Sequence, residues 1–433
     1  MSETENILAL LKQEVSPALG CTEPAAVALA GAYAASVLEG TIISANLIVS
    51  PNILKNGMGV GIPNTNLLGL DIAFALGILV AKPDKELEVL ADLDEEKIAS
   101  AKKMLEENRI TTQMNETEEK IWIEAILQTD KSESRAILRW RHNWLFHLEK
   151  DNQVLKHKEI ETEEECFLLS PLSYTLKDYY DCCVNIDIDR LESIDLGLIQ
   201  NRKIADYGLF NQSGINLGRL IMNKIECGLL GDDIHHYAMA LTAAATDARM
   251  SGCNLTVISN SGSGNQGLAI TLPIIAVAEK LNSNKDELLR ALAMGHLVSI
   301  HIKQKIGILS CLCGCLSASA GAASGIVMLL KGNYPQIEYA IKNMIADTAG
   351  MVCDGAKEGC SLKVATTTSA AVQASLLATE GICVSANDGI ITESIEGTID
   401  NLAYFVAKGM QDADSTILNI MLDKDNKGCK NEL

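Results

Sequence analysis

A chain of 433 residues is long enough for two domains, and because 48% of its residues are apolar it is not disordered as a whole. The formal net charge of −20 argues against nucleic acid and against an anionic membrane surface, since phosphate groups are bound by basic residues. The acidic N-terminus lacks the basic start and apolar core of a signal peptide, so we expect a cytoplasmic protein whose 13 cysteines are thiols, metal ligands or catalytic groups rather than disulfides.

Residues 1–180 predict an α/β domain that closes with antiparallel strands. Some segments repeat apolar residues with helical spacing, whereas others are rich in β-branched residues and stop at proline or at short polar turns. Thr22 is placed to cap the helix after the GCTEP motif, and Pro24 falls in its first turn, where a missing N–H costs nothing. In chain order we expect helices at residues 4–15 and 25–38, a strand at 41–51, helices at 67–80 and 86–108, and a group of strands at 120–151.

Residues 181–433 predict a second, mainly α-helical domain, so the expected fold class is α+β. Glycine-rich loops interrupt its helices, and such loops let backbone amides approach a ligand. The loop SNSGSGNQG lacks the lysine of a phosphate-binding loop, but it can supply the side-chain amides of Asn265 and Gln266. Residues 306–330 are uncharged and long enough to span a bilayer, yet they are mostly Ser, Gly, Ala and Cys. We interpret them as a buried helix.

The cysteines in glycine-containing motifs are the candidate metal ligands: Cys311, Cys313 and Cys315 in C-x-C-G-C, and Cys353 and Cys360 in CDGAKEGC. Thiolates are soft ligands that suit zinc or an iron–sulfur cluster. The paired C-x2-C knuckles of zinc sites and the bacterial ferredoxin pattern are both absent, so spacing alone does not select the metal. In a regular helix Cys311 and Cys315 share a side that Cys313 does not, so we expect at least one of them to be a packing residue.

Cys21 and Cys360 each stand where a helix is expected to begin. The exposed amides and the helix dipole favour negative charge there, so we expect a lowered thiol pKa. Such a thiol suits a ligand, a nucleophile or a base, and the alternative for Cys21 is a packing role in a tight turn. Glu23 is the nearest rival base.

Histidines and lysines near the loops widen the set of candidates. His296 and His301 could be ligands or bases, but we favour buried core residues for both. Pyridoxal phosphate requires a Schiff-base lysine and a phosphate-binding cup. The Schiff-base lysine could be one of three lysines near the loops: Lys55, Lys303 and Lys357. Composition alone therefore does not exclude pyridoxal phosphate.

Four motifs together resemble the L-cysteine desulfidase family, whose relatives include serine dehydratase-like alpha-subunit proteins: GCTEPAAVALA, SNSGSGNQGL, IKQKIGILSCLCGC and CDGAKEGCSLKVATTTSAAVQASLLA. The resemblance covers most of the chain. It implies an oxygen-sensitive 4Fe–4S cluster with one open iron, and no pyridoxal phosphate. By motif position the cluster ligands are Cys313, Cys353 and Cys360, and the family's proposed base matches Cys21. A resting-state bond between Cys21 and the open iron is an alternative.

The reaction implied by the resemblance converts L-cysteine and water to pyruvate, ammonia and sulfide. A soft thiolate is the better ligand for iron, which favours cysteine over serine as the substrate. Loop position suggests the residues that hold the substrate: Lys55, Asn56, Asn265, Gln266 and Lys303. An L-serine dehydratase with the same cluster and a non-catalytic cluster protein or sensor are the alternatives. The expected partner is a small amino acid bound between the two domains. Whether the protein forms a homo-oligomer is left open.

Overall fold

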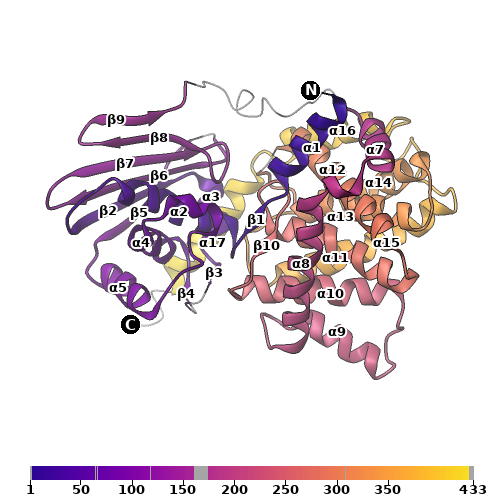
Figure 1. Ribbon diagram of the computed structural model, residues 1–433, viewed down its shortest axis with the longest axis horizontal. Helices are drawn as coiled ribbons and strands as arrows, with labels where there is room; N and C mark the ends of the chain where they lie inside the picture. The colour runs from indigo at the N-terminus through magenta and orange to yellow at the C-terminus, as the bar shows by residue number, and fades with distance from the viewer. Residues whose placement is uncertain are drawn as a thin grey trace.

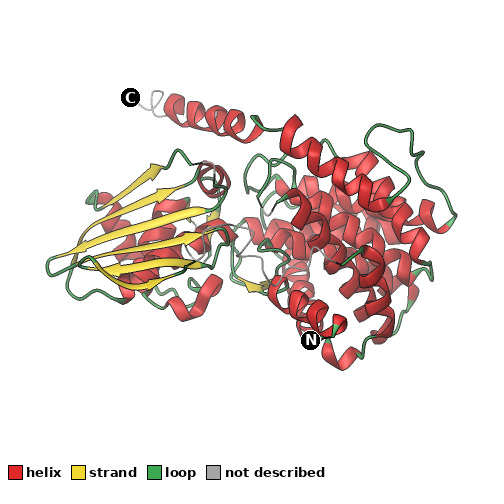
Figure 2. Ribbon diagram, turned by 90° about the horizontal axis from the view of Figure 1, so that it is seen from above, coloured by secondary structure: helices red, strands yellow, loops and turns green. Residues whose placement is uncertain are grey.

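Most buried apolar side chains form two cores, one in each lobe of the molecule (Figure 1). The structure is a computed structural model that describes residues 2–63, 65, 67–117, 119–159, 174–307 and 309–428. One lobe carries a six-stranded sheet, and the other consists mostly of helices (Figure 2). This arrangement confirms the predicted α+β class.

The sheet has the spatial order β5-β2-β6-β7-β8-β9, in which β2 and β5 run parallel and all other neighbours are antiparallel. In β2, Ala45, Leu47 and Val49 are buried, as the two-residue period of a strand requires. The edge strands β5 and β9 were not predicted, because few of their side chains are buried. The strands span Ile42–Val49 (β2), Ile110–Met114 (β5), Trp122–Thr129 (β6), Glu133–Arg139 (β7), Leu145–Lys150 (β8) and Gln153–His157 (β9).

Two helices, α2 (Thr22–Ser36) and α4 (Leu70–Val80), pack against each other beside the sheet, with α2 touching β6 and β7. Small residues allow the two helices to approach closely. A Cβ atom at Gly77 would lie 2.0 Å from the carbonyl oxygen of Ala28, so only glycine fits at that crossing. The alanine-rich sequence of α2 therefore builds a core with few aromatic side chains.

Three local expectations in this lobe are wrong. Cys21, not Thr22, is the N-cap of α2, and its side chain makes no capping bond. Leu67–Leu68 form the short strand β4 and pair with β3 (Gly61–Ile62), so the helix starts only at Leu70. Residues 86–108 do not form one helix, because Glu86 has a positive φ of 47° within a 3-10 segment (Pro83–Glu88) and α5 (Glu95–Glu106) begins afterwards.

The second lobe is a bundle of helices in which α13 is buried on nearly every side. A Cβ at Gly321 on α13 would lie 2.1 Å from the carbonyl oxygen of Gly295 on α12, so these two backbones almost touch. The helices span Leu176–Asn185 (α7), Glu192–Phe210 (α8), Leu217–Glu226 (α9), Ile234–Met250 (α10), Gly264–Leu281 (α11), Lys285–Ile306 (α12), Gly314–Leu329 (α13), Tyr334–Thr348 (α14), Cys360–Thr379 (α15) and Ile395–Tyr404 (α16).

The two ends of the chain cross between the lobes (Figure 1). Helix α1 (Glu3–Glu14) buries Ile7, Leu10 and Leu11 in the core of the helical lobe, although it precedes the whole sheet in sequence. Helix α17 (Ala413–Gly428) returns to the sheet lobe and contacts α3 (Pro51–Gly57). The division of the chain at residues 180 and 181 stays a prediction.

The apolar stretch at residues 306–330 is not one continuous helix. Helix α12 ends at Ile306, and α13 begins at Gly314 after an irregular segment that contains two of the cysteines. Among the helices that the structure describes, none is both long and apolar enough to cross a membrane.

Candidate active site

A cavity of about 110 Å³ collects most of the predicted site residues. Its walls come from the GCTEP segment, from α3, from the loop at residues 259–267 and from the cysteine motifs of the helical lobe. Of the ten residues that we assigned to a ligand, base or substrate-binding role, only Lys55 does not line it; the other nine are Cys21, Glu23, Asn56, Asn265, Gln266, Lys303, Cys313, Cys353 and Cys360.

Backbone pairing brings two of the cysteine segments together. Leu312 and Val352 form an isolated antiparallel bridge. Beside it, the Cys313 amide donates to the Met351 carbonyl at 2.9 Å, and the Cys353 amide donates to the Cys311 carbonyl at 2.7 Å. Two motifs that lie about 40 residues apart in sequence are thereby fixed side by side.

Helix starts place two of the three predicted ligands. Cys313 is the N-cap of α13, and Cys360 is the first residue of α15. Both thiols therefore lie at the positive end of a helix dipole. The premise of a regular helix through C-x-C-G-C is wrong, because α13 begins only after Cys313. Cys315 also lines the cavity, whereas Cys311 does not.

The thiols of the cavity differ in how readily they ionise. A hydrogen bond from Cys315 lowers the pKa of Cys313 to about 7, against the effect of burial, and the charges of Lys363 and Lys303 act in the same direction. That same bond, together with burial, raises the pKa of Cys315 well above its usual value. Burial raises the pKa of Cys353, and it raises the pKa of Cys360 to about 12. Cys313 is therefore the best prepared of the four to bind as a thiolate.

This set of donors suits a soft metal centre. Cys313, Cys353 and Cys360 supply three soft thiols to one cavity, with the ammonium groups of Lys303 and Lys363 beside them. Within the described residues, no three potential ligands converge closely enough to hold one metal ion. The ligands of an iron–sulfur cluster bind different irons, so they need not converge on one point.

Cys21 lies at the N-terminus of α2 as predicted, but its predicted low pKa is wrong. The thiol is 3% exposed, and its sulfur is 3.9 Å from the sulfur of Met250. Burial raises the pKa of Cys21 to about 11, although the charge of Arg249 lowers it. Gly20 has a φ of 66°, and a Cβ there would lie 2.7 Å from Pro63, so this glycine is required by the turn.

The carboxylate of Glu23 is held from the α3 side of the cavity. The side-chain amide of Asn56 donates to Glu23 Oε1 at 2.9 Å, while Asn56 Oδ1 is buried without a partner among the described residues. His142, which was not predicted, also lines the cavity with a buried and unbonded Nε2. Burial lowers its pKa, and Glu23 opposes that shift. Glu23 is thus oriented and lies near a second titratable group.

Arg249 is the other residue that sequence reasoning missed. Its side chain is 4% exposed and lies at the cavity wall. Nη2 donates to the carbonyl of Gly20 at 2.6 Å, and Nη1 donates to Oδ1 of Asn265 at 2.9 Å. The guanidinium therefore joins two motifs of the site. The available signal was a lone cation near the end of the apolar, alanine-rich segment AMALTAAATDARM.

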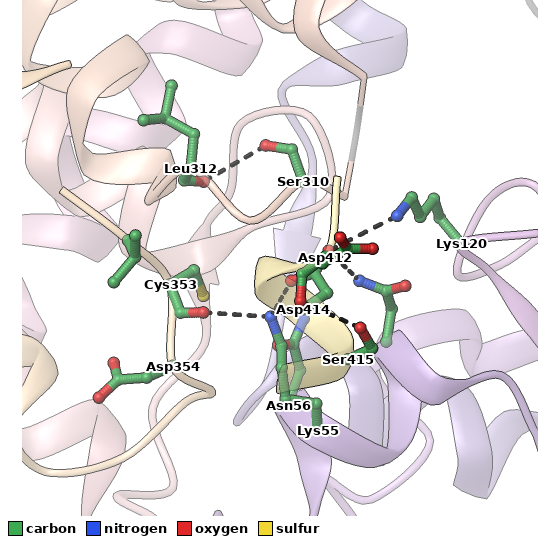
Figure 3. A network of polar contacts seen from close by, with 12 residues as sticks. Lys55, Asn56, Lys120, Ser310, Leu312, Cys353, Asp354, Asp412, Asp414 and Ser415 are labelled. Carbon is green, nitrogen blue, oxygen red and sulfur yellow. Dashed lines mark hydrogen bonds and ion pairs between the residues drawn. The ribbon is translucent and has the colours of Figure 1, made fainter. Parts of the chain in front are cut away.

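The predicted role of Lys55 in holding the substrate is not supported by its position. The side chain is 1% exposed and does not line the cavity. Its ammonium group pairs with Asp414 of α17 at 2.5 Å and donates to the Cys353 carbonyl at 3.1 Å (Figure 3). Lys303 does line the cavity, and burial lowers its pKa to about 8 against the effect of Cys353 and Cys313. Lys55 instead ties a cysteine loop to the C-terminal helix.

Neither histidine of α12 lines the cavity. His296 is buried, and Asn260 Nδ2 lies 3.1 Å from its Nδ1. Nε2 of His301 lies 2.8 Å from a carboxylate oxygen of Glu396, which also pairs with Lys305 at 3.0 Å. Burial raises the pKa of Glu396, but these two partners outweigh it and hold the pKa at about 2. Both histidines lie in the core, which is the position we favoured.

Comparison with known proteins shows the family of this chain. A family model described as the serine dehydratase alpha chain matches residues 84–419, a range that includes Cys313, Cys353 and Cys360 but not Cys21. A UPF0597 protein of Bacteroides fragilis (strain YCH46) is 41% identical over 429 residues, 99% of both chains. A UPF0597 protein of Alkaliphilus oremlandii is 44% identical over 418 residues, 96% of this chain and 97% of that one. The chain belongs to the serine dehydratase alpha chain family.

Proposed function

We propose that this protein is a cytoplasmic lyase that breaks down L-cysteine without pyridoxal phosphate. L-cysteine and water would give pyruvate, ammonia and hydrogen sulfide, with loss of the Cα proton and of the β-sulfur followed by hydrolysis of the aminoacrylate. The observation that carries the proposal is the cavity itself, which is lined by Cys21 and Glu23 together with three thiols that suit a soft metal centre. Membership of a family named for an amino-acid dehydratase supports a lyase.

Cys313, Cys353 and Cys360 would hold a 4Fe–4S cluster in this cavity. When bound, such a cluster supplies a Lewis-acidic iron for the leaving sulfur. The helix start at Cys313 favours its thiolate, and the charge of Lys303 acts on Cys313 and Cys353. The hydrogen bond from Cys315 favours the thiolate of Cys313, which gives Cys315 a supporting role.

The chain's own residues would remove the Cα proton. Cys21 is the proposed base, because its thiol lies at the cavity and at the start of α2. Its pKa of about 11, which already includes the lowering effect of the Arg249 charge, makes the thiolate a strong base but a rare species at pH 7. Glu23 is the rival base, since its carboxylate lies at the cavity and is oriented by Asn56.

The direct test is turnover by protein that is purified and loaded with iron and sulfide under anaerobic conditions. With L-cysteine we expect equal amounts of pyruvate, ammonia and sulfide, together with the visible absorption and iron content of a four-iron cluster. Pyruvate from L-serine at a comparable kcat/KM would instead identify a serine dehydratase, the reaction named by the family description. No turnover of either amino acid by a fully loaded protein would favour a cluster protein or sensor.

A further inference from the structure

Arg249 is a buried cation without an acidic partner in the part of the chain that the structure describes. Its side chain is 4% exposed, and both of its hydrogen-bond acceptors, the Gly20 carbonyl and the Asn265 amide, are neutral. Its Nε is buried and has no hydrogen-bond partner. A buried charge is costly unless it is paired. This guanidinium therefore has donors and a charge left over at the wall of the cavity.

Two other cations with little exposure pair with a carboxylate. Lys55 is 1% exposed and pairs with Asp414 at 2.5 Å. Arg141, with a side chain 13% exposed, pairs with Glu14 at 2.8 Å. Arg249 instead faces a cavity of about 110 Å³, which Lys303 also lines. The missing counter-charge can therefore be supplied by a ligand.

We propose that Arg249 binds the α-carboxylate of the substrate, which makes a free carboxylate the main requirement for recognition. The inference rests on the proposed function, in that it places an amino acid in this cavity. A guanidinium presents five N–H donors in a fixed fork, and only two of its nitrogens have partners here. A carboxylate that accepts from the remaining donors would also neutralise the buried charge.

The fixed position of the guanidinium supports this role. A Cβ atom at Gly264, the first residue of α11, would lie 2.5 Å from Arg249 Nε and 2.6 Å from its Cζ. Glycine at this position therefore makes room for the guanidinium against the helix start. The bonds to Gly20 and Asn265 hold it from two other sides, so a substrate meets a donor that is already oriented.

Acceptor atoms on other residues of the cavity complete the match to an amino-acid zwitterion. Asn56 Oδ1 is a buried acceptor without a partner among the described residues, and the Glu23 carboxylate is bonded to the amide of the same side chain. An α-ammonium group can donate to both.

Two thiol inhibitors can separate the carboxylate from the other ends of the substrate. 3-Mercaptopropionate has the carboxylate and lacks the amine, whereas cysteamine has the amine and lacks the carboxylate. Both carry the same thiol, so contacts with a metal cancel in the comparison. The measurement is the inhibition constant of each compound on the loaded enzyme with L-cysteine, or its dissociation constant by calorimetry if the enzyme turns over no amino acid.

In Arg249→Gln we expect 3-mercaptopropionate to bind about 100-fold more weakly or worse, while cysteamine changes less than about threefold. Arg249→Lys should recover part of the loss, because it keeps the charge but not the fork. Gly264→Ala should weaken 3-mercaptopropionate in the same selective way, since it displaces the guanidinium without removing it. Arg219→Gln, an exposed arginine on α9, is the matched control and should change neither constant.

Equal weakening of both inhibitors would overturn the assignment, because Arg249 would then act on the thiol end, for example by stabilising Cys21 or the metal site. Unchanged binding of 3-mercaptopropionate in both Arg249→Gln and Gly264→Ala would overturn it as well. Either result leaves the proposed reaction standing if the wild-type enzyme still releases sulfide from L-cysteine. Conversely, selective binding by an enzyme that turns over no amino acid would keep the carboxylate site and reject the reaction.

Discussion

Replacing Asp414 with asparagine should destabilise the fold, because it leaves the ammonium group of Lys55 buried without a counter-charge. Lys55 is 1% exposed, and the side chain of Asp414 is 11% exposed. The two side chains join α3 to α17, and the remaining oxygen of Asp414 accepts from Asn52 at 2.9 Å. Lys55 also donates to the Cys353 carbonyl, so the pair supports a loop of the active site (Figure 3).

The size of the effect follows from burial and distance. At 2.5 Å, two unit charges attract by about 6–7 kcal/mol at an effective dielectric constant of about 20. Part of that energy offsets the desolvation of Lys55, and removing one partner of a buried pair costs about 3–5 kcal/mol. The Cys353 carbonyl remains as an acceptor, so we expect a loss of about 3 kcal/mol in the free energy of unfolding. The iron content should also fall.

Urea denaturation of the iron-free protein, followed by circular dichroism, measures this change. Asp181→Asn is the matched control, because the Lys177–Asp181 pair is exposed and its loss should cost only about 0.3–0.5 kcal/mol. Removing both charges in Lys55→Met/Asp414→Leu should cost less than Asp414→Asn alone, since no charge is left buried. A loss below about 1 kcal/mol in Asp414→Asn would refute the reasoning, because Lys55 would then reach water or another acceptor.

Three further predictions concern the proposed cysteine ligands, the proposed base and the ion pairs of Glu396. Cys313→Ala should abolish the visible absorption of the cluster, and so should the same change at each of the other two proposed ligands. Cys311→Ala should retain most of the iron. Full iron content in Cys313→Ala contradicts the assignment. Cys21→Ser should keep the iron and lower kcat about 100-fold or more; wild-type turnover there, with an inactive Glu23→Gln, makes the carboxylate the base. Glu396→Gln should lower the free energy of unfolding by about 1–2 kcal/mol at pH 7. This difference between variant and wild type should disappear between about pH 4.5 and pH 2, because the pKa of Glu396 is held at about 2 in the folded protein. A difference that persists at pH 2 argues against this linkage.

Periodicity predicted the fold class, because the strands and helices with one buried face repeat apolar residues at regular intervals. Strand β6 (Trp122–Thr129) and helix α1 (Glu3–Glu14) are of this kind and lie where they were expected. Strand β5 (Ile110–Met114) was missed, since it is an edge strand with mostly exposed side chains. The irregular path between α12 and α13 was missed because small apolar residues suit either a helix or a tight turn.

The candidate site was predictable where one short motif carries both the donor and the helix start. Cys360 is such a case, since a glycine and a helix beginning are visible beside it in the sequence, whereas the helix start at Cys313 was not predicted. Lys55 was misplaced because its partner Asp414 lies 359 residues away. Arg249 was missed for the same reason, as it bonds to Gly20 across 229 residues. Long-range contacts decide which polar residue of a loop faces a cavity, and local sequence does not contain them.

Cys21 shows how a local rule can be outweighed by tertiary structure. A helix start lowers a thiol pKa by a modest amount, whereas complete burial raises it by more, and here burial dominates. The path of the chain before Cys21 explains why its thiol is buried. Pro17 and Ala18 pair with Ile258 and Val257, which places the GCTEP segment beside the glycine-rich loop at residues 259–267.

That backbone pairing means the two halves of the site are joined before any cofactor or substrate is present. Helix α1 belongs to the helical core and α2 to the sheet core, so Cys21 lies at the crossing between them. The Ser259 amide donates to the Ser16 carbonyl at 2.8 Å, and Arg249 closes the same junction from α10. Because Cys21 and Arg249 meet at this junction, a motion that opened the lobes would separate Cys21 from Arg249 and from the thiols of α13 and α15. Proton removal therefore depends on the contact between the lobes, whereas Arg249 on α10 and the metal-binding thiols lie together in the helical lobe.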